Sequence, residues 1–85
     1  MPVLCRFMGV TIFMFWKDHN PPHFHARYGE YLAALDFEGN IIMGTLPPRV
    51  LSMIQEWTSI HLEELKNNWI RMQTKQYPYP IKPLE

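Results

Sequence analysis

The chain of 85 residues has little of several residue types, and each shortage narrows the kind of protein it encodes. Its single cysteine, Cys5, excludes an internal disulfide, which fits a reducing cytoplasm. No apolar run approaches the length of a membrane span, and no stretch resembles a secretory signal. Eight acidic and eight basic residues cancel, so no net charge attracts the chain to nucleic acid or to a membrane surface. We therefore expect a small cytoplasmic protein.

Aromatic residues, by contrast, are plentiful. Twelve Phe, Tyr and Trp side chains are many for a chain whose core is small, so some of them are expected to face a partner, such as a second copy in a homodimer. Hydrophobic residues make up 47% of the sequence, which excludes intrinsic disorder. The length allows one domain over residues 1–85.

The first forty-five residues predict β-strands. Short β-branched or aromatic runs alternate with turn signals at residues 9–10, 29–30 and 37–41. The two prolines within residues 20–22 force an irregular connection between the first hairpin and the second. The pattern predicts four or five antiparallel strands in a meander over about residues 3–45.

After Pro47 and Pro48 the period of the sequence changes to that of a helix. Proline is tolerated at the first helical position, and the residues of one face then recur every three or four positions. They are Val50, Ile54, Trp57, His61, Leu65, Trp69 and Met72. Ser59 could cap a second helix, but one continuous helix over about residues 48–73 is the simpler interpretation. The predicted fold class is α+β, with the meander packed on one long C-terminal helix that is followed by an extended tail over residues 74–85.

The segment DHNPPHFHARYGEY concentrates the residues that carry chemistry. Strand alternation places His23, His25 and Arg27 on one side of the sheet and the apolar side chains of that strand on the other. A two-residue turn after Tyr28 sets His23 opposite Asp36, whose carboxylate could orient the imidazole. Two imidazoles, a carboxylate and a guanidinium would then share one surface.

Three functions fit this surface, and the sequence leaves all three open. The two histidines could act as acid and base in a ribonuclease that needs no metal or other cofactor, with Arg27 stabilising charge and Asp36 orienting His23. A metal could instead be held by His19, His23 and His25, although their spacing matches no standard zinc pattern. In the third interpretation the histidines are structural, in a non-catalytic binding or regulatory protein.

The C-terminal part of the chain carries a local excess of positive charge. Residues 66–84 include four cations and no acid. Cations interleaved with aromatic rings are typical of contacts with single-stranded RNA, and an acidic protein partner would fit as well. The candidate binding residues here are Lys66, Arg71, Lys75, Tyr77 and Tyr79.

Three blocks of the sequence, DHNPPHFHA, YGEY and LPPR, together resemble the small bacterial proteins of the Domain of Unknown Function 4160 family. The family's motif positions fall on His19, His23, His25 and Tyr28, among others, so His19 and Tyr28 join the candidate binding residues. The resemblance implies a bacterial cytoplasmic component of a two-gene, toxin–antitoxin-like module, which acts through contact with a small protein encoded alongside. It implies no specific reaction.

Overall fold

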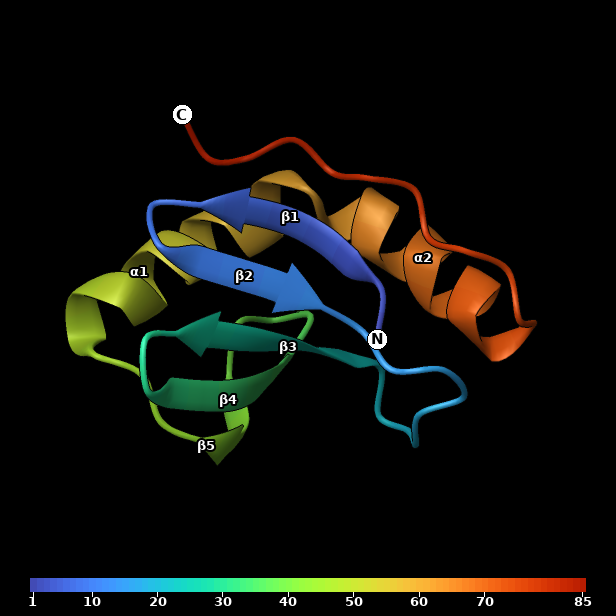
Figure 1. Cartoon of the computed structure of the whole chain (residues 1–85), viewed down its shortest axis with the longest axis horizontal. Coiled ribbons are helices and arrows are strands. Elements are labelled where there is room, and N and C mark those ends of the chain that lie inside the picture. Colours follow the sequence, from blue (N-terminus) through green and yellow to red (C-terminus); the bar gives the residue numbers. More distant parts are fainter.

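A computed structural model describes all 85 residues, and it has the α+β architecture expected from the sequence. One antiparallel sheet has the order β1-β2-β3-β4-β5, so each strand pairs with the next along the chain. The strands are β1 (Val3–Phe7), β2 (Val10–Phe13), β3 (His23–Tyr28), β4 (Tyr31–Asp36) and β5 (Ile41–Gly44). Two helices, α1 (Pro48–Ile60) and α2 (Leu62–Gln73), lie behind the sheet in Figure 1. Neither helix has the length and apolar character that crossing a membrane requires.

The central hairpin of β3 and β4 has the predicted register. Phe24 lies opposite Leu35, and Ala26 lies opposite Ala33. All four side chains are at most 2% exposed and belong to the hydrophobic core, together with the apolar residues of both helices. The alternation of side chains along β3 therefore separates a core face from an opposite face, as the sequence indicated.

We call the side of the sheet that points away from the helices the open face. Residues that pair across antiparallel strands point to the same side, so the register defines this face. It carries Thr11, Phe13, His25, Arg27, Leu32, Ala34 and Met43.

The prediction of one long helix is wrong, because the helix breaks at His61. This residue has φ −110° and ψ 28°, outside the helical range, and separates α1 from α2. Just before the break, the Thr58 hydroxyl donates to the Ile54 carbonyl oxygen and the Ser59 hydroxyl donates to the Glu56 carbonyl oxygen. Hydroxyls that bond back to the preceding turn bend helices, and no side chain caps α2. The two helices still bury most of the predicted stripe, namely Val50, Ile54, Trp57, Leu65, Trp69 and Met72.

The tail after Gln73 makes a turn at Thr74 and Lys75, then runs without regular secondary structure, and is attached to the body of the protein. The Ile81 amide donates to the Leu4 carbonyl oxygen at 2.9 Å, on the outer edge of β1. The Trp57 indole N–H donates to the Lys82 carbonyl oxygen, also at 2.9 Å. The tail thus runs beside α2 and along β1 (Figure 1), while β5 forms the opposite edge of the sheet.

Cys5 packs as a small apolar residue of the core. Burial raises the pKa of its thiol, although a hydrogen bond with Trp57 acts in the other direction. A buried thiol with a raised pKa is a poor nucleophile, so Cys5 is not a candidate functional residue.

Gly44 ends β5 in a conformation that excludes a side chain. Its φ is +82°, and an added Cβ would lie 2.9 Å from the Ala33 Cα and closer still to the Leu32 carbonyl oxygen. Gly44→Ala should therefore distort the pairing of β4 with β5 and lower the free energy of unfolding by about 3 kcal/mol in a urea titration.

Gly29→Ala is the matched control for this substitution. Gly29 also has a positive φ, of +57°, but an added Cβ would meet no atom within 4 Å. We expect a loss of about 1 kcal/mol there, from backbone strain alone. Equal losses for the two variants would contradict the close contact at Gly44.

Candidate functional site

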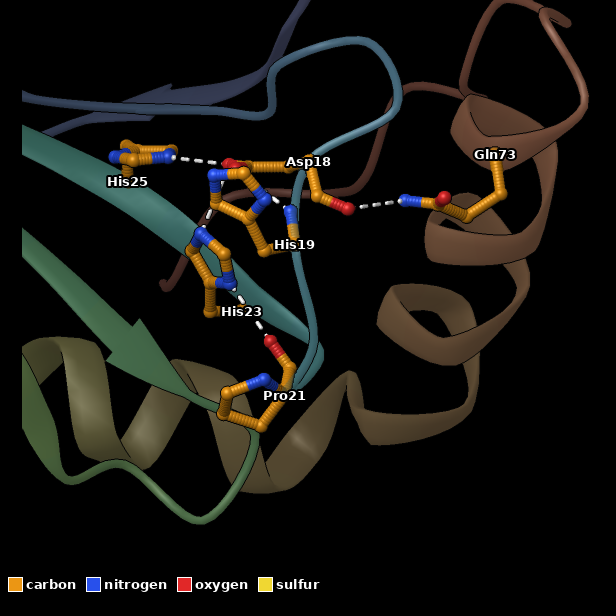
Figure 2. A network of polar contacts seen from close by, with 6 residues as sticks. All are labelled: Asp18, His19, Pro21, His23, His25 and Gln73. Atoms are coloured by element: carbon orange, nitrogen blue, oxygen red, sulfur yellow. Dashed lines mark hydrogen bonds and ion pairs between the residues drawn. The ribbon is translucent and has the colours of Figure 1, made fainter.

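Asp18, His23 and His25 form a compact cluster where the loop between β2 and β3 approaches the start of β3 (Figure 2). The Asp18 Oδ2 atom lies 2.8 Å from His23 Nε2 and 3.1 Å from His25 Nε2. The side chains are only 16%, 9% and 15% exposed, in the order Asp18, His23 and His25. Two shielded imidazoles therefore share one carboxylate oxygen.

Two hydrogen bonds hold Asp18 in this position. The Gln73 side-chain amide of α2 donates to the Asp18 carbonyl oxygen at 3.0 Å (Figure 2), and the His19 amide donates to Asp18 Oδ1 at 2.9 Å. Burial by itself raises the pKa of the Asp18 carboxyl. The hydrogen bond from His25, the His19 amide and the charges of His23 and His25 outweigh it, so this pKa lies below its ordinary value. Asp18 is therefore an ionised carboxylate at neutral pH.

His23 has a hydrogen-bond acceptor next to each of its ring nitrogens. Its Nδ1 lies 2.7 Å from the Pro21 carbonyl oxygen, and its Nε2 faces the Asp18 carboxylate. Both oxygens only accept, whereas a neutral imidazole has a single N–H to donate. The contact with Pro21 assigns that proton to Nδ1. The Nε2 atom then needs either a second proton or a cation between itself and Asp18.

His25 lies between two phenylalanine rings at one end of the open face. Its ring stacks on Phe13, with centroids 5.3 Å apart and planes 16° apart, and meets the Phe15 ring at a steep angle with centroids 4.4 Å apart. Aromatic contacts of this kind restrict the rotation of the imidazole, whose Nε2 contacts Asp18. The site is thus preorganised by packing as well as by hydrogen bonds.

A cavity of about 290 Å³ opens beside the cluster. All three side chains of the cluster line it, and Phe15, His19 and two residues of β5, Ile42 and Met43, also contribute to its wall. The cluster therefore borders a space that a small molecule can enter.

The structure brings together only part of the predicted catalytic group. His23 and His25 lie in the cluster, and Asp36 pairs with His23 in the strand register, as predicted. However, the Asp36 carboxylate accepts hydrogen bonds from two backbone amides of the turn that follows it, both at 2.9 Å. The prediction that Asp36 orients His23 is therefore wrong, and Asp18 contacts this imidazole instead.

The other predicted residues of the histidine segment are more dispersed. His19 lines the cavity, but the ligand atoms that lie within 4.8 Å of one another belong to Asp18, His23 and His25, so the predicted set of three histidines is not formed. Arg27 is exposed on the open face, two positions beyond His25 along β3. Tyr28 is partly buried and packs against the core.

The candidate residues of α2 and the tail make different kinds of contact. Lys66 lies 3.6 Å from a glutamate one turn earlier on the exposed side of α2. The Arg71 guanidinium stacks over the Tyr79 ring at 4.0 Å and donates to the Tyr77 carbonyl oxygen at 2.6 Å. Arg71 and Tyr79 therefore attach the tail to α2.

Lys75 and Tyr77 line a shallow cavity together with Trp16 and Lys17, two residues of the loop between β2 and β3. The Trp16 and Tyr77 rings meet edge to face, with centroids 5.2 Å apart. Two lysines beside two aromatic rings are compatible with the predicted RNA contact, which stays a prediction.

The model of one protein family, described as a domain of unknown function (DUF4160), matches residues 9–70. No curated protein and no solved structure matches the chain. The matched range covers most of the sequence and includes Asp18, His23 and His25. The chain that builds this cluster therefore belongs to the DUF4160 family.

Proposed function

We propose that the protein binds a divalent transition-metal ion through Asp18, His23 and His25. The observation that carries this proposal is the orientation of His23, whose Nδ1 contacts a backbone carbonyl while its Nε2 faces an ionised carboxylate. An Nδ1–H bonded to a carbonyl oxygen, with Nε2 directed at the ion, is the usual arrangement of a histidine that binds metal. In the neutral imidazole the Nε2 lone pair would face the Asp18 carboxylate, and a cation at this point would replace that repulsion by coordinate bonds.

The donor atoms favour particular ions. Two imidazole nitrogens and one carboxylate oxygen suit zinc, cobalt(II) or iron(II), whereas magnesium and calcium prefer oxygen ligands. Ligands about 2.0–2.1 Å from a tetrahedral ion are about 3.3 Å apart. The distances from Asp18 Oδ2 to the two Nε2 atoms, 2.8 and 3.1 Å, are a few tenths of an ångström below this value, and the ligand atoms of all three residues lie within 4.8 Å of one another.

Three protein ligands leave one coordination position for water or for a substrate, as in catalytic zinc sites. The cavity of about 290 Å³ beside the cluster offers room for this fourth ligand. A metal-bound water is a nucleophile at neutral pH. The reaction class that we propose is therefore metal-assisted hydrolysis.

Titration with cobalt(II), followed by visible absorption and by calorimetry, tests the metal site. We expect one ion per chain and the intense bands of a four- or five-coordinate cobalt site. His25→Ala should remove both signals. His61→Ala is the matched control, since His61 pairs with Glu64 at the junction of the helices and should leave binding unchanged. Binding that is absent, or that His25→Ala leaves intact, would contradict the proposal.

A second candidate is the acid–base site without metal, and the contact of one Asp18 oxygen with both imidazoles favours it. Asp18 would then take the orienting role first given to Asp36, and Arg27 would meet the phosphate of an RNA substrate. A chelator separates the two candidates. RNA hydrolysis that survives chelation supports this second candidate, whereas loss of activity and its rescue by zinc support the metal site.

The wider role is proposed from the sequence. In this role the protein is a bacterial cytoplasmic component of a two-gene, toxin–antitoxin-like module, in contact with a small protein encoded alongside or with a second copy of the chain. Exposed apolar side chains away from the open face support a contact of this kind, since Ile60 is 59% exposed and Tyr77 is 73% exposed.

A further inference from the structure

The open face of the sheet carries a hollow of about 390 Å³. Ala34 of β4 lies in the middle of one row of paired residues, with His25 on one side and Met43 on the other. Its methyl group is much shorter than these two neighbours, which accounts for a depression at this point. Phe15 and Leu32 also line the hollow, so its wall is mainly apolar.

Arg27 adds a positive charge to this apolar wall. It pairs with Leu32 in the next row of the open face. All the ion pairs of the chain are made by other residues, so the guanidinium has no acidic partner. An arginine of this kind is available to pair with an anion that a ligand supplies.

The hollow adjoins the cavity beside the Asp18–His23–His25 cluster, since the two share Phe15, His25, Ala34 and Met43 in their walls. Residues two apart on a strand are about 7 Å apart, so Arg27 lies about this far beyond His25. A ligand whose charged group meets Arg27 can thus extend over Ala34 toward the cluster.

We propose that this hollow binds a small amphipathic monoanion, namely a carboxylate on an apolar chain or ring. One guanidinium balances one negative charge, and its parallel N–H groups match the two oxygens of a carboxylate. The volume falls in the range of small-ligand pockets, and an apolar wall with few polar groups is typical of them. The proposal rests on the proposed function in one respect only, namely that the end of the ligand away from Arg27 would lie beside a metal ion.

Octanoate is the probe, with octanol as the uncharged molecule of the same chain length. Binding is measured by calorimetry and by amide shifts in NMR spectra, which should change most around Ala34 and Met43. Arg27→Gln should lower the affinity for octanoate at least about tenfold and leave the affinity for octanol unchanged. Arg6→Gln is the matched control. Arg6 lies on the same face, across Thr11 from Arg27, and is not among the residues that line the hollow.

Two further variants separate this proposal from the metal site. Ala34→Leu fills the hollow and should abolish the binding of both probes, with an unchanged circular dichroism spectrum. Asp18→Asn should weaken the binding of cobalt(II) and leave the affinity for octanoate in the metal-free protein unchanged. If octanoate binds and cobalt(II) does not, the hollow is supported and the proposed function fails.

Three results would overturn the proposal. The first is equal affinity for octanoate and octanol. The second is an equal loss of octanoate affinity in Arg6→Gln and Arg27→Gln, which indicates a general attraction to the positive charge of this face and no specific pairing with Arg27. The third is a dimer, detected by sedimentation at the concentrations of the titration, in which a second copy of the chain covers the open face.

Discussion

Replacing Asp18 with alanine is expected to lower the affinity for zinc by at least about 100-fold, because the variant loses the only anionic ligand of the site. The two imidazoles that remain, His23 and His25, would bind the ion with fewer bonds and without charge compensation. Competition with a chromophoric zinc chelator measures the change. Circular dichroism at the same temperature shows whether the variant is folded.

His19→Ala is the matched control for this experiment. The His19 side chain lies at the same cavity but outside the group of close ligand atoms, and its backbone amide, which contacts Asp18, is retained in the variant. We expect a change in zinc affinity of less than about threefold. A large loss in His19→Ala with little loss in Asp18→Ala would restore the set of three histidines expected from the sequence.

Trp57→Ala should lower the free energy of unfolding by about 3–5 kcal/mol, the range for removal of a large buried aromatic side chain. Trp57 is fully buried, and its ring centroid lies 5.9 Å from that of Phe7 and 5.9 Å from that of Phe24, so it links α1 to the sheet. Its indole N–H also binds the tail at Lys82. A urea titration measures the loss.

Glu56→Ala is the control for this substitution, and Trp57→Phe separates the packing of the Trp57 ring from its hydrogen bond to the tail. Glu56 precedes Trp57 in α1 and is exposed, so its removal should cost less than about 0.5 kcal/mol. Trp57→Phe keeps much of the apolar volume but removes the bond to the tail, at a cost of about 1–2 kcal/mol. Similar small losses in all three variants would show that Trp57 is not central to the core.

The sheet could be predicted because its pattern is local. A period of two fixes which side each residue of β3 faces, and a glycine turn at residues 29–30 fixes the partner of each residue in β4. The break at His61 could not be predicted in the same way. The hydroxyls of Thr58 and Ser59 bond back to the turn just before the break, whereas the apolar period continues across it.

The site was predicted less well, because its carboxylate comes from a loop. Asp18 lies outside the strands, so strand alternation does not predict where its side chain points. The Gln73 side chain that binds its carbonyl oxygen lies 55 positions further along the chain. Asp36 was correctly predicted to pair with His23, but its carboxylate accepts hydrogen bonds from the turn at the end of β4. Short polar side chains next to turns commonly bond to the local backbone, and strand register alone does not show this.

The tail that runs along β1 limits how copies of this protein can assemble. Unpaired edges are the places where sheets of separate molecules join, and a molecule with two such edges can add neighbours without end. Here the C-terminal segment occupies one edge through the bond between Ile81 and Leu4, so β5 is the edge that remains for pairing. Growth of the sheet from molecule to molecule would stop at a closed pair and would not continue into a fibre.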